Sequence, residues 1–468
     1  MKFRIFIAVI ILGGCAVGPD YKRPETAAPA QYKELAGWRQ AQPRDAAPRG
    51  PWWALFGEPE LDALMKRVEV SNQTIRAADA RLRQARAVAD QARAGLFPTV
   101  SATGSATRSK SPSLANAPTT SRAVNTFSAT GNASWELDLW GKVRRSIESG
   151  EASWQASAAD LEAARLSVRA SLAQNYFALR VAASSQKMLE DTVAAYQRSL
   201  EMTKNRYAAG VVARVDVVQA EVQLKSAQAQ LIDVGVERAQ LEHAVALLVG
   251  EAPANFSLAP APISAMKMPG IPIGLPSDLL ERRPDIAAAE RSVAAANAQI
   301  GVAKAAYFPS LTLSGAAGYR SSDAANLFNL PHRLWSLGAS ATQSVFDGGR
   351  LRAVTAEKVA AYDAEVADYR QAVLTGFQEV EDNLAALRIL EEEAQIQDEV
   401  VQAARHALEL TLNQYKAGVV SYLNVISAQA TALSNERAAA AILGRRLTAA
   451  TALVKALGGG WSSEALPR

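Results

Sequence analysis

One segment of this chain occurs twice, and each copy interrupts a long stretch of helix-forming residues. The first copy, RYAAGVVARVDVVQAE, begins at Arg206, and the second, QYKAGVVSYLNVISAQ, begins at Gln414. Seven of the sixteen positions are identical, and the offset is 208 residues. Because glycine accepts a positive φ without steric penalty, Gly210 and Gly418 predict that the chain reverses between two helices at both places.

The repetition extends far beyond these two turns. Gly250 matches Gly458 at the same offset, and LFPTVSATGSATRS from Leu96 resembles YFPSLTLSGAAGYRS from Tyr307 at an offset of 211 residues. Self-similarity at a fixed period is the signature of an architecture built from one repeated unit. We therefore expect a tandem duplication, with a connector that contains seven prolines between the two copies. The expected ranges are residues 61–251 for repeat 1, 252–284 for the connector and 285–458 for repeat 2.

Long helices are predicted by the distribution of proline. No proline occurs between Pro118 and Pro253, or between Pro331 and Pro467, and proline breaks helix interiors. A helix that fills most of such a window spans on the order of 100 Å, and its apolar residues recur at coiled-coil spacing. A globular helical bundle is the alternative, although such bundles seldom use helices of this length. The expected helices are residues 142–209 and 215–249 in repeat 1, and 350–417 and 423–457 in repeat 2.

Each long helix is preceded by a shorter helix and two strand-like runs. The shorter helices are expected at residues 61–96 and about 285–307, where Pro98 and Pro309 stop them. The runs have about the length that a tilted membrane strand needs, and in repeat 1 apolar residues alternate with polar ones. The expected hairpins are residues 99–137, with strands 99–108 and 126–137, and residues 311–346, with strands 311–320 and 337–346.

The number of strands limits what these hairpins can build. No apolar helical stretch long enough to span a bilayer follows the N-terminus, so a mature chain that crosses a membrane must cross it with strands. Four strands cannot close a barrel, and open edges are not tolerated in lipid. Three chains would supply twelve strands around a water-filled lumen. If the strands span a membrane, the sequence requires an oligomer but does not by itself fix three copies. The expected fold class is mainly α with membrane β-hairpins: an oligomeric α/β-barrel with four strands and long coiled-coil helices per chain.

The first fifteen residues, MKFRIFIAVIILGGC, have the features of an export signal. Lys2 and Arg4 precede a short apolar core, and Cys15, the one cysteine of the chain, follows two glycines. This pattern resembles a bacterial lipoprotein signal, which implies removal of residues 1–14 and acylation of Cys15 with chains such as palmitate. Ala16, in place of aspartate, favours sorting to the outer membrane. An ordinary export signal with an incidental cysteine is the alternative.

Composition and motifs argue against other classes of function. The chain has 50 basic and 46 acidic residues, whereas nucleic-acid-binding proteins usually have a strong basic excess. His243, His332 and His406 are far apart, and the sequence contains no nucleophile elbow, P-loop or dinucleotide fingerprint. We expect no enzymatic activity, no cofactor and no metal site.

Five motifs together resemble one protein family. They are CAVGPDYKRP from Cys15, WWALFGEPELDAL from Trp52, RRPDIAAAE from Arg282, YFPSLTLSG from Tyr307 and the two Y-x-A-G turns. They occur over nearly the whole mature chain and are similar to those of TolC-type outer membrane factors of efflux systems, in the lipoprotein (NodT-like) subgroup.

The resemblance implies a trimeric, passive export duct in the outer membrane with a large periplasmic part. Its belt would be formed by the N-terminal anchor and equatorial segment (residues 15–60), the connector and the C-terminal tail (residues 459–468). Its implied partners are two further copies, outer membrane lipid, a periplasmic adaptor (membrane fusion) protein and an inner-membrane pump of the RND type. A structural or adhesive outer-membrane lipoprotein with a coiled-coil stalk is the alternative, and a tethered enzyme is a third class.

The resemblance also assigns roles at the two turns. It implies that a hydrogen bond between Tyr415 and Asp216 of neighbouring hairpins helps to close the aperture. Some members line the constriction with aspartates, where this chain has Asn424 and Ser427, so a neutral aperture is expected here. The residues implied in adaptor docking are Gly210, Val211, Val212, Gly418, Val419 and Val420. A plain helical hairpin, in which glycine only caps the helix, is the alternative.

Overall fold

A computed structural model describes residues 16–26, 28–34, 51–110, 123–263, 266, 268–271 and 279–467. The elements as far as the connector are η1 (Trp52–Phe56), α1 (Pro59–Ser71), α2 (Gln73–Ala94), β1 (Thr99–Ser109), β2 (Val124–Leu137), α3 (Lys142–Ala208), α4 (Arg214–Leu248) and η2 (Pro253–Asn255). Those that follow are α5 (Leu279–Arg282), α6 (Pro284–Ala305), β3 (Ser310–Ser321), η5 (Ala324–Asn326), η6 (Leu330–His332), β4 (Arg333–Thr342), α7 (Arg350–Lys416), α8 (Tyr422–Ala456) and η7 (Ser463–Ala465).

The chain divides into two compact units, and several helices pass from one to the other. Unit 1 consists of Met1–Glu25, Leu82–Ala156 and Ala289–Tyr369, and unit 2 consists of Thr26–Arg81, Ser157–Ala288 and Arg370–Arg468. Among the helices that the structure describes, none has an apolar stretch long enough to cross a membrane.

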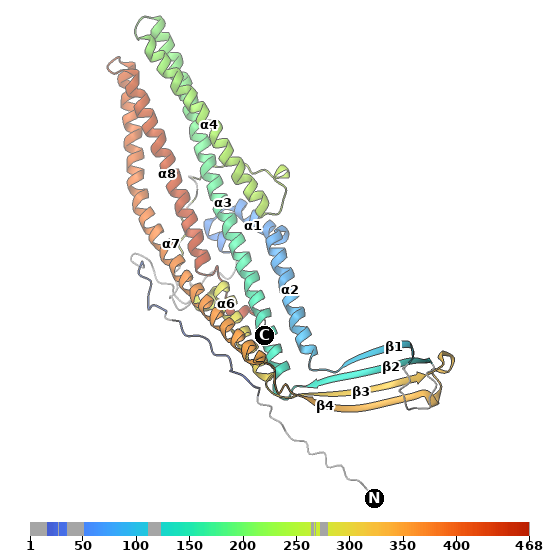
Figure 1. Ribbon diagram of the computed structural model, residues 1–468. Helices are drawn as coiled ribbons and strands as arrows, with labels where there is room; N and C mark the ends of the chain where they lie inside the picture. The colour runs from blue at the N-terminus through green and yellow to red at the C-terminus, as the bar shows by residue number, and fades with distance from the viewer. Residues whose placement is uncertain are drawn as a thin grey trace. The chain divides into compact units, whose positions relative to one another are not determined.

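Unit 1 contains the sheet, whose four antiparallel strands lie in the order β1-β2-β3-β4 (Figure 1). The expected strand at residues 337–346 is wrong in position, because β4 begins and ends four residues earlier. Its neighbour β3 begins at Ser310, directly after Pro309, and Ser310 pairs with Thr342. Residues after Thr342 therefore have no strand beside them with which to pair.

The first described residues of the chain are bound to unit 1 by a backbone hydrogen bond and an ion pair. The Val17 amide donates to the Trp140 carbonyl at 3.0 Å, and Asp20 forms an ion pair with the buried Arg145 at 2.7 Å. Cys15 itself lies outside the described residues. The segment that follows it is thus attached where β2 leads into α3.

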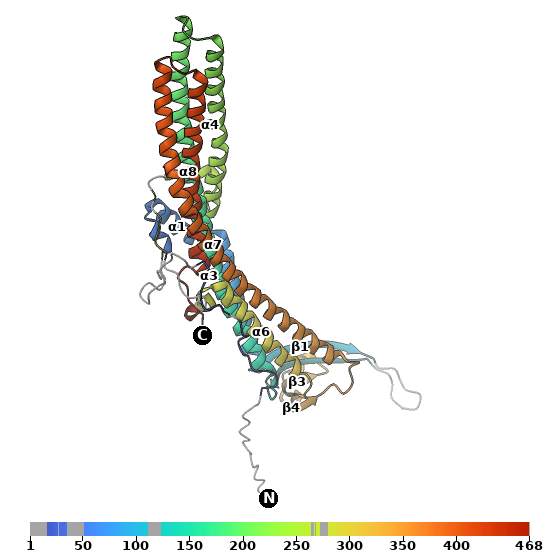
Figure 2. The same cartoon turned by 90° about the vertical axis from the view of Figure 1, so that its left-hand side faces the viewer.

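In unit 2, four helices form two hairpins with a shared core. Helix α4 lies along α3, and α8 lies along α7, in both views (Figures 1 and 2). Near the turns one buried cluster contains residues from all four helices: Tyr196, Leu200, Ala220, Leu224, Ala227, Tyr415, Tyr422 and Val425. The two hairpins therefore exclude water together.

The helix predicted at residues 61–96 is wrong as a single element, because Asn72 divides it into α1 and α2. Asn72 has an extended backbone (φ −65°, ψ 124°), and its side-chain oxygen accepts from the Ile75 amide at 3.0 Å. Its side-chain nitrogen donates to the carbonyl of Leu248, the last residue of α4, at 2.7 Å. A residue that caps one helix end and binds another in this way favours a break over a continuous helix.

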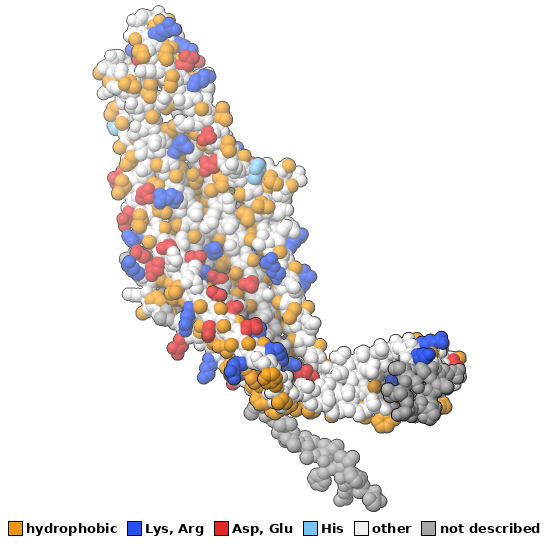
Figure 3. Space-filling model, in the orientation of Figure 1, with side chains coloured by type: hydrophobic (Ala, Val, Ile, Leu, Met, Phe, Trp, Pro, Cys, Tyr) orange, Lys and Arg blue, Asp and Glu red, His pale blue; other side chains and the backbone are white. Residues whose placement is uncertain are grey.

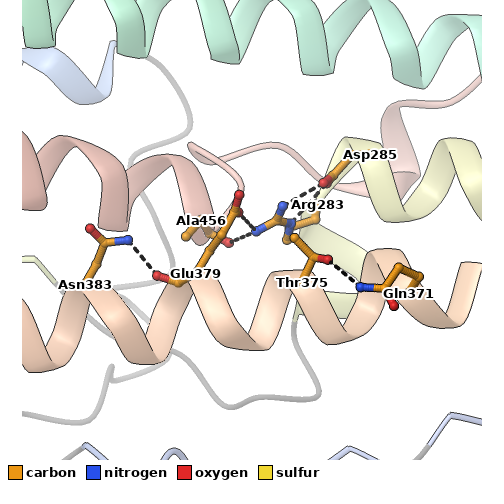
Figure 4. A network of polar contacts seen from close by, with 7 residues as sticks. All are labelled: Arg283, Asp285, Gln371, Thr375, Glu379, Asn383 and Ala456. Atoms are coloured by element: carbon orange, nitrogen blue, oxygen red, sulfur yellow. Dashed lines mark hydrogen bonds and ion pairs between the residues drawn. The ribbon is translucent and has the colours of Figure 1, made fainter.

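The range expected as repeat 2 has a junction at the matching sequence position, built around Arg283 (Figure 4). This buried guanidinium forms ion pairs with Asp285 and Glu379, both at 2.6 Å. It also donates to the carbonyl of Ala456, the last residue of α8, at 3.2 Å. Asn72 and Arg283 occupy matching positions at the 211-residue offset. We call α4 and α8, the second helix of each hairpin, the return helices, and the end of each is bound by a different side chain.

Glycine is required where the return helices end. Gly250 and Gly458 have φ values of 77° and 87°, which place them in the left-handed region. A Cβ on Gly250 would clash with the Ser71 carbonyl, and a Cβ on Gly458 would clash with the Arg282 carbonyl. The end of α4 therefore lies with its backbone against the segment between α1 and α2, and the end of α8 lies against the segment between α5 and α6.

Candidate functional site

The first turn, residues 207–216, joins α3 to α4 through a left-handed glycine. Gly210 has a φ of 75°. Its amide donates to the Tyr207 carbonyl, and the Val211 amide donates to the Arg206 carbonyl, both at 2.9 Å. These two bonds form a Schellman motif, which satisfies the last carbonyls of a helix.

The second turn, residues 415–424, joins α7 to α8 with the same geometry. Gly418 has a φ of 80°, its amide donates to the Tyr415 carbonyl at 3.0 Å, and the Val419 amide donates to the Gln414 carbonyl at 2.9 Å. The structure therefore places both predicted glycines at helix reversals.

Each turn exposes apolar surface. Val211 is 61% exposed and Val419 is 71% exposed, whereas Val212 and Val420 are half-buried. Val420 packs against the shared core of the two hairpins. At each turn, one valine thus faces solvent while the next is partly covered.

Tyr415 is buried within its own chain. It is 4% exposed, and its hydroxyl lies 3.2 Å from the Thr203 hydroxyl on α3. The ring contacts Tyr422, with ring centroids 5.5 Å apart, and burial raises the pKa of Tyr422 to about 12. Tyr415 therefore links the two hairpins of one chain.

Arg206 is the residue of this region that the sequence analysis missed. Its guanidinium donates to the Tyr415 carbonyl at 2.7 Å and lies over the Tyr415 ring at 4.7 Å from the centroid. A cation that binds a C-terminal carbonyl stabilises a helix end. The difference between Arg206 and Gln414, at equivalent positions of the two repeats, was the one sequence signal that pointed to it.

Among the described residues, Tyr415 forms its side-chain hydrogen bond with Thr203 and not with Asp216, Asn424 or Ser427, the other predicted aperture residues. Asp216 accepts from the Ala213 amide at 3.3 Å and so caps the start of α4. Asn424 and Ser427 are exposed on the first turns of α8. The hydrogen bond between Tyr415 and Asp216 of a neighbouring hairpin stays a prediction, since each residue has another partner within the single chain.

The sheet has two faces of different chemistry. Residues that pair across antiparallel strands lie on the same face, so the registers of the three strand pairs assign every position. One face is mostly apolar and includes Phe127, Trp135, Leu313, Tyr319, Trp335 and Leu337.

The opposite face is lined by hydroxyl groups. All of its positions on β1 are serine or threonine, and these residues occupy ten of its eighteen positions on the other three strands taken together. Its charged residues are Glu136 and Arg320, one near each end of the sheet. One face therefore suits a hydrocarbon environment and the other suits water.

Metal ligation has no support in the part of the chain that the structure describes, where no group of three or more His, Cys, Asp or Glu residues could hold an ion. His406 lies on α7, 3.9 Å from Glu409.

The family of the chain follows from comparison with known sequences. A model of the outer membrane efflux protein family matches residues 64–251 and 275–459. The chain belongs to this family.

Named outer membrane proteins of efflux and export systems are similar to this chain over nearly their whole length. The probable efflux pump outer membrane protein TtgC of Pseudomonas putida is 34% identical over 461 residues, which cover 97% of this chain and 94% of the relative. The pyoverdine export outer membrane protein OpmQ of Pseudomonas aeruginosa is 34% identical over 468 residues, which cover 99% of this chain and 98% of the relative.

Solved structures of outer-membrane channels have the same fold. The channel OprN has a TM-score of 0.86 at 32% identity, covering 96% of this chain and 100% of that chain. The open state of the Neisseria gonorrhoeae channel MtrE has a TM-score of 0.84 at 29% identity, covering 96% and 99%. These similarities confirm the predicted fold class and the resemblance to outer membrane factors of efflux systems.

Proposed function

We propose that this efflux-family chain is the trimeric outer membrane duct of a tripartite efflux system, which passively conducts substrates to the exterior. The observation that carries the proposal is the sheet, with one apolar face, one hydroxyl face and two unpaired edges, β1 and β4. Open edges are not tolerated in lipid, so neighbouring copies must pair with them. Three copies would supply twelve strands, with the hydroxyl face toward a water-filled lumen.

The mass of the detergent-extracted protein tests this proposal. A heat-sensitive trimer that inserts into planar bilayers and conducts ions is expected. A species that stays monomeric and lacks conductance would contradict the duct and would favour the alternative, a structural or adhesive lipoprotein with a coiled-coil stalk.

Passive conduction requires no catalytic group, so no enzymatic step is proposed. The energy for transport would come from an inner-membrane pump, and the RND type is the proposed class. The duplicated organisation belongs to the same proposal: repeat 1 (residues 61–251) and repeat 2 (residues 285–458) would each supply one hairpin of strands and one of helices. The matched family segments, one in each half of the chain, support it.

Acylation of Cys15 would anchor the chain in the outer membrane. The contacts of Val17 and Asp20 near the end of β2 support this, because they hold the adjoining segment close to the strands. The N-terminal peptide of the mature protein is expected to begin at Cys15 and to carry the mass of acyl chains. An N-terminal peptide that begins elsewhere, or an unmodified Cys15, would contradict the anchor.

The two turns would dock a periplasmic adaptor protein. The exposed valines, Val211 and Val419, support this role because they present apolar groups to solvent at both reversals. A photo-crosslinking amino acid at either position should capture the adaptor in cells. The same amino acid at Phe328, an exposed residue between β3 and β4, is the control and should not capture it.

The aperture would be closed by packing and by hydrogen bonds that include the predicted one from Tyr415 to Asp216 of a neighbouring hairpin. Asn424 and Ser427 would line it as neutral residues, which supports weak discrimination between cations and anions at this point. An Asn424→Asp variant is expected to increase cation preference in planar bilayers, and unchanged ion preference would place Asn424 away from the aperture.

A further inference from the structure

The two ends of the sheet differ in charge. At the end that leads into α3, two cations are paired with carboxylates: Lys142 with Glu136 and Arg144 with Asp138, both at 3.0 Å. At the opposite end, which we call the loop end, basic residues predominate, and Figure 3 shows Lys and Arg side chains gathered there. The described basic residues of the loop end are Arg108, Lys110, Arg320, His332 and Arg333.

Few carboxylates are available to balance the cations of the loop end. Asp323 is the acidic residue among the described positions there, and its oxygens accept from the Ala325 amide at 3.1 Å and the Asn326 side chain at 2.8 Å. The sequence between β1 and β2, SPSLANAPTTSR at residues 111–122, contains no aspartate or glutamate. The loop end therefore has an excess of positive charge.

The strand register separates these arginines by face. Arg108 pairs with Asn125, and Arg333 pairs with Tyr319, which places both arginines on the apolar face. Arg320 pairs with Ser128 on the hydroxyl face. A charged residue on a lipid-exposed face is tolerated near the membrane surface and is costly at the bilayer midplane.

Aromatic residues mark the same level of the apolar face. Trp335 is two residues from Arg333 on β4 and is well exposed. Tyr319, opposite Arg333, packs edge-on against Phe328, with ring centroids 5.5 Å apart. Amphipathic aromatic rings concentrate at the boundary between hydrocarbon and headgroups, so the two arginines lie at headgroup level.

We propose that Arg108 and Arg333 bind the phosphate of a phosphorylated lipid in the outer leaflet. This inference rests on the proposed trimer, because β1 and β4 are the two edge strands and would adjoin between copies. Arg333 of one copy and Arg108 of the next then lie on the same lipid-facing side at the loop end. Guanidinium groups bind phosphate oxygens in a bidentate manner, and two of them at one seam form a site for a phosphorylated headgroup.

The test compares variants that remove arginines from opposite faces. Wild type, the double variant Arg108→Gln/Arg333→Gln and the control Arg320→Gln are reconstituted in phosphatidylcholine vesicles that contain either bisphosphorylated or dephosphorylated lipid A. The measurement is the temperature at which the trimer dissociates. We expect bisphosphorylated lipid A to raise it by about 5 °C for wild type and Arg320→Gln, and the double variant to lose this gain.

Three results would overturn the inference: an equal gain in the double variant, an equal loss in Arg320→Gln, or the same gain from inorganic phosphate in pure phosphatidylcholine vesicles. The lysine variant Arg108→Lys/Arg333→Lys guards against misfolding, because it keeps both charges and should keep part of the gain. Failure of wild type to form any trimer in phosphatidylcholine would instead contradict the proposed duct itself.

Discussion

The two repeats hold equivalent helix ends with different chemistry. In repeat 1, the neutral Asn72 binds the last carbonyl of α4 and leaves no charge to neutralise. In repeat 2, the buried Arg283 binds the last carbonyl of α8 and forms ion pairs with both Asp285 and Glu379. The comparison teaches that two junctions with matching backbone geometry can be held together by different electrostatics.

The turns differ in the same manner. Tyr207 and Tyr415 are equivalent by the 208-residue offset, yet Tyr207 is 46% exposed and Tyr415 is buried. The second turn is bound by Arg206 from the first hairpin. Gln414, at the position equivalent to Arg206, has a shorter side chain without charge. The hairpins are therefore unequal, and substitutions at paired positions can separate their roles.

The largest effect is expected at the glycines that end the return helices, where the repeats should behave alike. Gly250→Ala and Gly458→Ala each combine a positive φ with a backbone clash and should lower the free energy of unfolding by more than about 3 kcal/mol. Chemical denaturation followed by circular dichroism measures this. Gly235→Ala within α4, where no atom lies near the added Cβ, is the control and should be neutral or slightly stabilising.

A smaller effect should distinguish the two junctions. Arg283→Met removes a buried charged donor from Asp285, Glu379 and the Ala456 carbonyl. The two carboxylates are 45% and 38% exposed and can be solvated, so the variant should destabilise by about 2–3 kcal/mol. Asn72→Ala removes a cap and one interhelix hydrogen bond and should destabilise by about 1–2 kcal/mol. Denaturation of the two variants under identical conditions checks the order. Equal losses would mean that the charge of Arg283 adds nothing to its junction.

The loss of stability should be smaller again when the contacts between Arg206 and the second turn are removed. Arg206→Gln copies the residue of repeat 2 and removes one hydrogen bond and one cation–π contact, with an expected loss of about 1.5 kcal/mol. Hydrogen exchange of amides in residues 415–419 should accelerate about tenfold, while amides in residues 207–211 stay unchanged. Acceleration at both turns would indicate general loosening of the shared core.

Removal of the tyrosine hydroxyls tests the inequality of the turns directly. Tyr415→Phe loses the hydrogen bond to Thr203 and the predicted one to Asp216 of a neighbour, with an expected cost of about 1 kcal/mol. Its closed-state conductance in planar bilayers should rise. Tyr207→Phe, at the exposed equivalent, is the control and should conduct like wild type; a rise in both, or in neither, would argue against a special role for Tyr415.

The smallest effect on stability at neutral pH is expected from the titration of Tyr422. The matching position in repeat 1 is Arg214, so this effect is specific to the second turn. Burial raises the pKa of Tyr422 to about 12, above the value near 10 in an unfolded chain. Because folding favours the protonated phenol, its contribution to stability is fully present below about pH 10 and is lost as the pH rises toward 12. The free energy of unfolding should fall more steeply over this range for wild type than for Tyr422→Phe. Identical slopes would place the titration elsewhere.

Local sequence signals account for much of the fold. The glycines at positions 210 and 418 end helices because only glycine adopts their φ without strain, and this requirement acts within a few residues. Alternation from Phe127 to Leu137 indicated which side of β2 is apolar. The proline-free windows predicted two long helices, and the glycines at positions 210 and 418 predicted the C-terminal ends of α3 and α7 to within one residue. These signals were enough to predict the fold class, which the comparison with solved outer-membrane channels confirmed.

Tertiary structure decided what depends on residues far apart in the chain. Asn72 breaks a helix whose own sequence favours continuity, because the carbonyl that it binds lies 176 residues away. The register of β4 was determined by the start of β3, and Tyr415 is buried in a core shared by four helices, where its hydroxyl contacts Thr203, 212 residues away. Periodicity and capping patterns describe interactions with near neighbours in the sequence, whereas these partners meet only once the helices and strands have packed.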